Sequence, residues 1–156
     1  DRYFESRLLS DVNHAHSVGQ PLSLLILDVD DFVQYNEKFG LHADDHVLSQ
    51  TAETIRDCIR DRDTACRLGS DEFSVILPNT SLDEAIVVSR RIVEAVAASS
   101  VTWQSVQVPL SISVGVGQYG ADANPEDITS RSDRALYNAK QSGKNTVRVF
   151  GASEGA

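Results

Sequence analysis

The chain has 156 residues, of which 41% are apolar, which is enough for one globular domain with a hydrophobic core. It carries 14 Lys and Arg against 23 Asp and Glu, and the net charge of −9 argues against nucleic acid as a partner. No apolar segment is long enough to cross a bilayer and no signal-like segment opens the chain. We therefore expect a cytoplasmic domain, in a soluble or a membrane-anchored protein, without direct membrane contact of its own.

The N-terminal part of the chain predicts a helix, a buried strand and two further helices. Apolar residues at helical spacing predict a first helix that ends before Gly19. Residues 22–27 are almost all apolar and predict a strand that is buried on both faces. Residues 31–38 fit a short helix closed by Gly40, and an amphipathic pattern over residues 47–59 predicts a longer one.

Hairpins and a helix are predicted for the middle of the chain. Residues 64–68 and 73–77 are strand-like and flank a turn, which predicts a hairpin. A capping pattern that starts at Ser81 opens an amphipathic helix. Residues 110–117 alternate between apolar and small residues and predict a strand, with which we expect the weaker strand candidate at 101–108 to pair.

The end of the chain predicts one more helix and one more strand. Asn124 and the proline after it open a helix that stops before Gly143, and residues 146–150 follow as a strand. The element order predicts an α/β fold of the α+β sandwich type. We expect residues 1–151 to be one domain of a larger signalling protein and residues 152–156 to be a frayed tail.

Two carboxylates follow the first predicted strand, where open α/β sheets commonly bind ligands. Asp28 and Asp30 flank the peptide carbonyl of Val29, and the next helix offers the free N–H groups of Asp31 and Phe32 to a phosphate. This pattern favours a metal-nucleotide site. The alternative is that the acidic residues only cap the helix and interact with its dipole.

A second acidic pair lies in the turn of the first predicted hairpin. Asp71 and Glu72 follow Gly69, which permits a positive φ or the close approach of another backbone. Such pairs are often solvated turns. However, two Mg²⁺ ions about 3.5–4 Å apart need hard oxygen ligands from separate segments, and Asp28, the Val29 carbonyl and Asp71 could supply them.

Motifs along nearly the whole chain share one order and spacing with a known family. They are Leu27-Asp28-Val29-Asp30-Asp31-Phe32, Asn36, Phe39-Gly40, Asp45, Arg67-Leu68-Gly69-Ser70-Asp71-Glu72-Phe73 and Ala135-Leu136-Tyr137-Asn138-Ala139-Lys140-Gln141-Ser142-Gly143-Lys144-Asn145. In these motifs the chain resembles the GGDEF domain of diguanylate cyclases. The resemblance implies a central, mostly antiparallel sheet flanked by helices, similar to the adenylyl cyclase catalytic core, with one GTP per domain and two domains facing each other.

The same resemblance implies a metal site and a catalytic pair. Asp28, the Val29 carbonyl and Asp71 would hold two Mg²⁺ ions, with Mn²⁺ as an alternative, and Asp71 and Glu72 would be catalytic. A 3′-hydroxyl of one GTP would attack the α-phosphorus of the other and release pyrophosphate, and a second round would complete cyclic di-GMP. The group that accepts the hydroxyl proton stays open between Glu72, a water and a substrate phosphate.

Substrate contacts are implied at seven positions of the chain. They are Phe32, Asn36, Asp45, Gly69, Ser70, Lys140 and Lys144. Asn36 and Asp45 would recognise guanine, whose N1–H and exocyclic amine suit a carboxylate acceptor. Lys140 and Lys144 would hold phosphates; the alternative for them is a basic last turn that complements a helix dipole.

A second site is implied by resemblance to the RxxD inhibitory site, which binds cyclic di-GMP. Arg60 and Asp63 match its motif in their offset from the hairpin, and Arg91 matches a further arginine. Arginine suits this role because its planar fork pairs with phosphate and stacks on guanine. The alternative is a solvated surface with ion pairs worth ~0–1 kcal/mol.

The chain also departs from the family pattern around the substrate. Ser70 replaces a glycine, Val33 replaces a frequent lysine, and Asp44 replaces a glycine beside the guanine-reading aspartate. We expect reduced turnover, because a lost cation and an added anion weaken GTP binding.

Our first hypothesis is an active, product-inhibited homodimeric cyclase, fused to sensor or phosphodiesterase-type domains. The second is a degenerate domain that binds cyclic di-GMP or GTP and regulates an attached domain; a dimerisation spacer without ligand is third.

Overall fold

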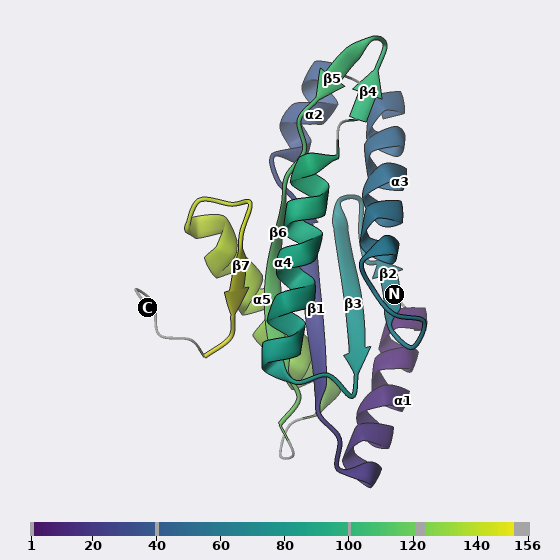
Figure 1. Cartoon of the computed structure of the whole chain (residues 1–156), viewed down its shortest axis with the longest axis vertical. Helices are drawn as coiled ribbons and strands as arrows, with labels where there is room; N and C mark the ends of the chain where they lie inside the picture. Colours follow the sequence, from purple (N-terminus) through teal and green to yellow (C-terminus); the bar gives the residue numbers. More distant parts are fainter. Residues whose placement is uncertain (1, 40, 100, 121–123, 152–156) are drawn as a thin grey trace.

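The computed structural model describes residues 2–39, 41–99, 101–120 and 124–151 (Figure 1). The helices are α1 (Arg2–Val18), α2 (Phe32–Phe39), α3 (Leu41–Asp57), α4 (Leu82–Ala98) and α5 (Pro125–Gln141). The strands are β1 (Leu22–Val29), β2 (Thr64–Arg67), β3 (Glu72–Pro78), β4 (Val101–Trp103), β5 (Val106–Val108), β6 (Ile112–Gln118) and β7 (Val147–Val149). The predicted tail at 152–156 and the helix stop at Gly40 lie outside the described residues.

A five-stranded sheet in the order β2-β3-β1-β6-β7 forms the centre of the fold. The β6–β7 pair is parallel and the other neighbours are antiparallel, so the predicted mostly antiparallel sheet is confirmed. β1 lies in the middle, between β3 and β6, and its residues 22–27 are fully buried. The prediction of a strand covered on both faces is confirmed.

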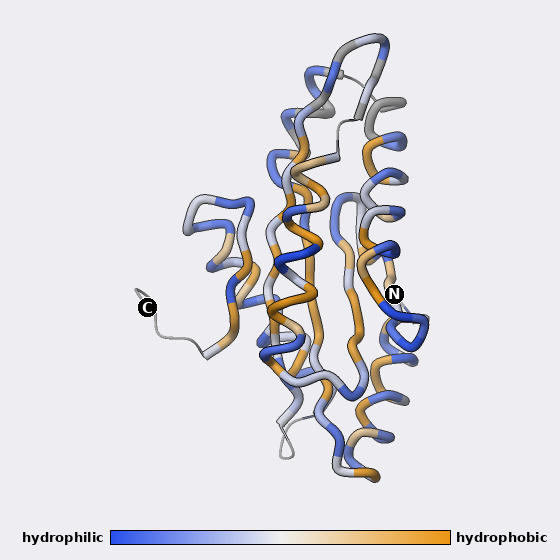
Figure 2. Tube along the Cα trace, viewed as in Figure 1, coloured by the Kyte–Doolittle hydropathy of each residue, from blue (hydrophilic) through white to orange (hydrophobic). Residues whose placement is uncertain are grey.

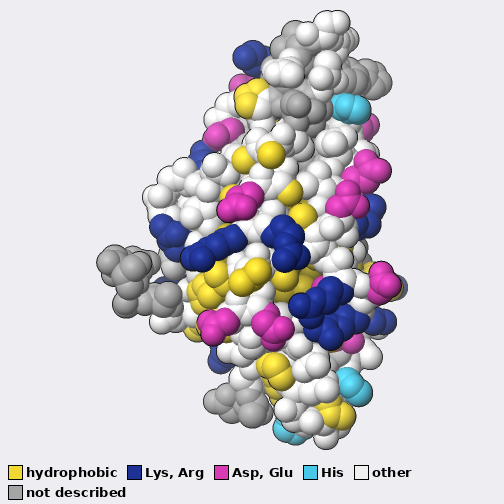
Figure 3. All heavy atoms as spheres, in the orientation of Figure 1, with side chains coloured by type: hydrophobic (Ala, Val, Ile, Leu, Met, Phe, Trp, Pro, Cys, Tyr) yellow, Lys and Arg dark blue, Asp and Glu magenta, His cyan; other side chains and the backbone are white. Residues whose placement is uncertain are grey.

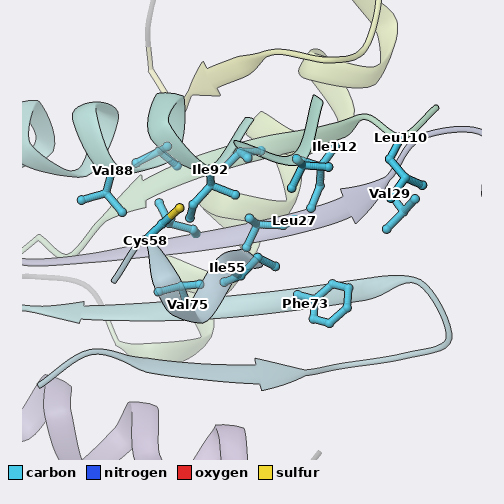
Figure 4. Close-up of a cluster of buried hydrophobic side chains, with 14 of the residues drawn as sticks. Leu27, Val29, Ile55, Cys58, Phe73, Val75, Val88, Ile92, Leu110 and Ile112 are labelled. Carbon is cyan, nitrogen blue, oxygen red and sulfur yellow. The ribbon is translucent and has the colours of Figure 1, made fainter. Parts of the chain in front are cut away.

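Helices cover both faces of this sheet (Figure 1). Leu25, Leu27 and Val29 point into a core formed with α3 and α4, part of which Figure 4 shows. Leu24 and Ile26 point into the second core, formed with α1 and α5, because strand side chains alternate between faces. In Figure 2 the hydrophobic colour accordingly follows the central strands and the inner turns of the helices.

Helix α5 packs unusually close to β6 because that strand carries glycine where the two meet. A Cβ built on Gly115 would lie 2.2 Å from the backbone nitrogen of Leu136 and 2.2 Å from the carbonyl oxygen of Ser132. The Ser132 hydroxyl also donates to the carbonyl of Leu24 at 3.0 Å, across the space that Gly117 leaves free. The close approach fixes where the C-terminal end of α5 lies relative to β1.

The predicted pairing of residues 101–108 with the strand at 110–117 is wrong. Strands β4 and β5 pair with each other in a separate two-stranded sheet, and β6 pairs with β1 and β7. Gln104 and Ser105 have φ values of 49° and 67°, which is the geometry of a tight two-residue hairpin turn. The segment therefore folds back on itself, while both edges of β6 are taken by other strands.

Two predicted helix starts have the expected caps. The Ser81 hydroxyl accepts from the amide of Glu84 at 3.2 Å while the Glu84 carboxylate accepts from the amide of Ser81 at 3.1 Å. Asn124 and Asp127 form the same reciprocal pair at the start of α5. None of the helices in the described part of the chain has the length and apolar character needed to span a membrane.

Candidate active site

The turn between β2 and β3 is attached directly to the end of β1. In the β1–β3 register Glu72 lies opposite Asp28, and the amide of Val29 donates to the carbonyl of Asp71 at 3.1 Å. Opposite residues of an antiparallel pair project to the same face, so the two acidic motifs meet on the α5 side of the sheet. The structure thus brings together two pairs of consecutive residues, Asp28-Val29 and Asp71-Glu72, which lie far apart in the sequence.

Asp28 has the features of a ligand for a cation. Its side chain is 24% exposed, and its Oδ1 is buried without a hydrogen-bond partner among the described residues. The pKa of Asp28 is raised from 3.8 to about 7, chiefly by burial and also by the carboxylates of Asp71 and Glu72, against the lowering effect of Lys140. A divalent ion would relieve this repulsion between carboxylates and satisfy the free oxygen.

The donor set fits a hard cation. It consists of the carboxylates of Asp28 and Asp71 and the main-chain carbonyl of Val29, and hard divalent ions prefer such oxygens. Within the described ranges, no three His, Cys, Asp or Glu side chains converge into a preformed metal cluster. A metal bound here would therefore need the peptide carbonyl of Val29 as well as carboxylate side chains.

Lys140, near the end of α5, reaches into this donor set. Its Nζ lies 2.7 Å from Oδ1 of Asp30, 3.3 Å from the carbonyl oxygen of Asp28 and 3.4 Å from that of Val29. It also lies 3.8 Å from Oδ1 of Asp28. The lysine expected to hold phosphate thus contacts the end of β1.

Asp30 accepts more hydrogen bonds than any other carboxylate described at this site, although the sequence motifs did not place it among the metal or substrate ligands. It is 2% exposed and accepts from four groups: the Ser111 hydroxyl (2.6 Å), the Ser113 hydroxyl (2.7 Å), Lys140 Nζ (2.7 Å) and the Asn145 amide (2.9 Å). Burial acts to raise the pKa of Asp30, but these hydrogen bonds outweigh burial and lower it. Ser113 in β6 and Ser111 just before it, which alternate with apolar residues, were the available sequence signal.

The loop after α5 wraps over Asp30 in a left-handed conformation. Gly143, Lys144 and Asn145 have φ values of 117°, 65° and 47°. Lys144 forms an ion pair with Asp31, which itself has a φ of 57° just before α2. Such strain in residues other than glycine costs on the order of 1–3 kcal/mol each and persists where neighbouring contacts impose it. Both lysines consequently lie next to the start of α2.

The remaining predicted substrate residues have different positions. The Phe32 side chain is 5% exposed in the core, so only its main-chain amide can face a phosphate at the start of α2. Asp45 is exposed on α3. The side chains of Asn36, Val33 and Asp44 lie outside the described part of the structure.

Gly69 and Ser70 form the exposed part of the hairpin turn. Arg67 donates from Nε to the Gly69 carbonyl at 3.1 Å and from a terminal nitrogen to the Ser70 carbonyl at 3.0 Å. Neither Gly69 nor Ser70 has a positive φ, and a Cβ on Gly69 would meet nothing within 4 Å. The turn therefore does not use the positive φ that Gly69 permits, and Ser70 fits it without backbone strain.

Glu72 lies in a partly buried, acidic environment. Burial raises the pKa of Glu72 above its ordinary value, and the nearby carboxylates of Asp133 and Asp71 raise it further. A carboxyl group with a raised pKa is a stronger base, which keeps Glu72 a candidate for proton transfer.

The predicted inhibitory residues gather where α3 ends. The amide of Arg60 donates to Oδ2 of Asp63 at 2.9 Å, while Oδ1 of Asp63 is buried without a hydrogen-bond partner among the described residues. Burial raises the pKa of Asp63 against the lowering effect of that bond. Arg91 on α4 donates to the carbonyl of Cys58 at 3.4 Å. Figure 3 shows Lys and Arg side chains gathered across the middle of the face over α4.

Comparison with known proteins agrees with this geometry. The family model described as "Diguanylate cyclase, GGDEF domain" matches residues 1–146. The chain belongs to the GGDEF domain family. As a GGDEF domain it has the cyclase-like sheet and the acidic hairpin that the sequence indicated.

Individual relatives of this GGDEF domain carry matching names. It is 38% identical over 151 residues to Diguanylate cyclase A of Treponema denticola, a match covering 94% of the chain and 41% of that protein. It is 35% identical over 149 residues to the Response regulator PleD of Caulobacter vibrioides, covering 94% of the chain and 33% of that protein. The chain thus spans less than half the length of these relatives.

A solved structure supports the fold of the GGDEF domain. The active GGEEF domain of a diguanylate cyclase from Vibrio cholerae superposes with a TM-score of 0.91 at 29% identity. That match covers 98% of this chain and 97% of the other.

Proposed function

We propose that this GGDEF domain is a diguanylate cyclase, which condenses two GTP molecules into cyclic di-GMP and pyrophosphate as a homodimer with Mg²⁺. The observation that carries the proposal is the convergence of Asp28, the Val29 carbonyl and Asp71 at the end of β1. Oδ1 of Asp28 is buried without a hydrogen-bond partner among the described residues and has only the 3.8 Å ion pair with Lys140, which supports a cation ligand there. A structural spacer has no need of a buried carboxylate oxygen that lacks a hydrogen bond.

Asp28, Val29 and Asp71 would hold the metal. Bound there, Mg²⁺ would lower the pKa of the attacking 3′-hydroxyl and offset the charge that develops on the phosphate. Glu72 lies beside this set with a raised pKa and can accept a proton. These residues supply the chemistry of the half-site in each protomer.

The chain's cations and free amides would hold the triphosphate. Lys140 and Lys144 lie at the end of α5 near the start of α2, whose first amides, including that of Phe32, lack partners within the helix. Asn36 and Asp45 would bind the guanine edge. Gly69 and Ser70 leave the space over the turn open for the nucleotide.

Product analysis of a forced dimer tests the proposal. The domain, fused to a dimerising partner, is incubated with GTP and Mg²⁺, and cyclic di-GMP is measured by mass spectrometry. We expect the parent to form cyclic di-GMP, and Asp71→Asn to lose at least about a hundredfold in rate because a direct metal contact is removed. The exposed Asp57→Asn on α3 is the matched control and should keep the parent rate. A parent that forms no product, indistinguishable from Asp71→Asn, contradicts the proposal.

We infer that Arg60, Asp63 and Arg91 bind cyclic di-GMP, in an active cyclase or in a degenerate binding domain. Oδ1 of Asp63 has no hydrogen-bond partner among the described residues, so it would have an acceptor position for a guanine N–H once its side chain turns toward the ligand. Titration with cyclic di-GMP by calorimetry should show an affinity loss of about tenfold or more for Arg60→Ala, as expected for a lost charged hydrogen bond. Arg56→Ala, an exposed arginine in the last turn of α3, should bind as the parent does. Unchanged affinity in Arg60→Ala rules out the assignment.

A further inference from the structure

The ammonium group of Lys140 lies where a cation would be expected. Four oxygens surround its Nζ: Asp30 Oδ1 at 2.7 Å, the Asp28 carbonyl at 3.3 Å, the Val29 carbonyl at 3.4 Å and Asp28 Oδ1 at 3.8 Å. Two of these, the Val29 carbonyl and the Asp28 carboxylate, belong to the donor set assigned above to the metal. The same oxygens thus face a lysine in one state and a divalent ion in the other.

The Lys140 ammonium and a divalent metal ion would repel each other if both were bound to these oxygens. A divalent ion bound to Val29 and Asp28 would lie within a few ångströms of the ammonium, in a site where Lys140 is only 22% exposed. Repulsion between like charges at such short range is strong where little water screens it. Lys140 must therefore leave the Val29 carbonyl when the metal binds.

Asp30 holds Lys140 beside the metal donors, but its own position does not depend on that lysine. Its carboxylate is 2% exposed and is also held by Ser111, Ser113 and the amide of Asn145. Asp30 therefore does not need Lys140 to stay in place. A lysine side chain has several rotatable bonds, so its ammonium can swing from Val29 toward an incoming phosphate while its backbone stays fixed in α5.

We propose that Lys140 is a tethered counter-ion of the metal site, which occupies the Asp28 and Val29 oxygens in the nucleotide-free domain and competes there with divalent metal. The proposal rests on the proposed function only in the identity of the metal donors. It makes metal and nucleotide binding cooperative: phosphates draw Lys140 away from the donors, and the metal then binds without a neighbouring positive charge. Lys140 would thus occupy the metal donors first and contact phosphate only after it leaves them.

Metal binding without nucleotide tests the proposal directly. Free Mn²⁺ is measured by electron paramagnetic resonance during titration of the parent, Lys140→Gln, Lys140→Arg and Lys144→Gln, each shown to be folded by circular dichroism. Lys140→Gln should bind Mn²⁺ about tenfold or more tightly than the parent, because a nearby like charge has been removed. Lys140→Arg should stay as weak as the parent. Lys144→Gln is the matched control, because Lys144 pairs with the exposed Asp31 outside the donor set.

The outcomes separate this proposal from the proposed function. Equal or weaker Mn²⁺ binding by Lys140→Gln, including no detectable binding by either protein, overturns the counter-ion role. An equal gain of Mn²⁺ affinity in Lys144→Gln overturns it too, because the loss of any nearby positive charge would then have the same effect. Adding Asp28→Asn to Lys140→Gln should abolish the gain. Should the parent form no cyclic di-GMP while Lys140→Gln still binds Mn²⁺ more tightly, the cyclase proposal fails and the counter-ion role stands.

Discussion

Replacing Asp28 by Asn should stabilise the metal-free domain at pH 8 while it abolishes cyclic di-GMP synthesis. The folded protein raises the pKa of Asp28 from 3.8 to about 7, chiefly by burial and against the effect of Lys140. A carboxyl group with a raised folded pKa favours folding most below its unfolded pKa, and that contribution is lost as the pH rises through the folded value. At pH 8 the ionised Asp28 therefore destabilises the fold by about 2–4 kcal/mol.

Urea unfolding between pH 4 and pH 8, without metal, measures this effect. The stability difference between Asp28→Asn and the parent should be small near pH 4 and grow up to pH 8, in the window set by pKa values of 3.8 and about 7. Asp57→Asn, an exposed position on α3 outside the site, is the matched control. A variant that is less stable than the parent at pH 8, or a stability difference that does not depend on pH, contradicts the interpretation that ionised Asp28 destabilises the fold.

Gly115→Ala should lower the stability of the domain by about 3 kcal/mol or more and reduce turnover at the same time. The added methyl group would meet the backbone of α5 at 2.2 Å, at the nitrogen of Leu136 and the carbonyl oxygen of Ser132. Backbone atoms inside a helix cannot move aside as a flexible side chain can, so α5 must shift as a unit. Because α5 carries Lys140, the shift also displaces the active site.

Thermal and urea unfolding of Gly115→Ala and Gly69→Ala provide the comparison. A Cβ on Gly69 meets nothing within 4 Å and its φ is not positive, so Gly69→Ala should change stability by no more than about 0.5 kcal/mol. The same substitution thus has opposite expected outcomes at two glycines. A Gly115→Ala protein as stable as the parent would show that α5 is not held as tightly against β6 as the structure indicates.

Local patterns predicted most elements of this fold. The apolar run at 22–27 could only suit a strand covered on both faces, and the capping patterns at Ser81 and Asn124 located the starts of α4 and α5. Strand alternation at 101–108 predicted a strand but contained no signal for its partner. The turn at Gln104-Ser105 lacks glycine, so its left-handed geometry was not visible in the sequence.

The sequence motifs indicated candidate residues for the site but not the contacts between them. The motifs indicated Asp28, Asp71 and Lys140 as site residues. The contact between Lys140 and Asp30 was not predictable, because the two residues lie 110 positions apart in the sequence. Asp30 appears in the sequence as one more acid at a strand end. Only the packing of α5 against β6 reveals it as the buried group that holds a lysine and a strained loop.

Val29 shows how the site can be robust to mutation. Its side chain is 1% exposed and packs in the core with α3 and α4, while its amide holds the hairpin through the Asp71 carbonyl and its own carbonyl faces Lys140. The side chain at this position therefore contributes only packing. The proposed metal donor belongs to the peptide group, which every amino acid supplies, so amino-acid replacements compatible with the strand leave this oxygen available.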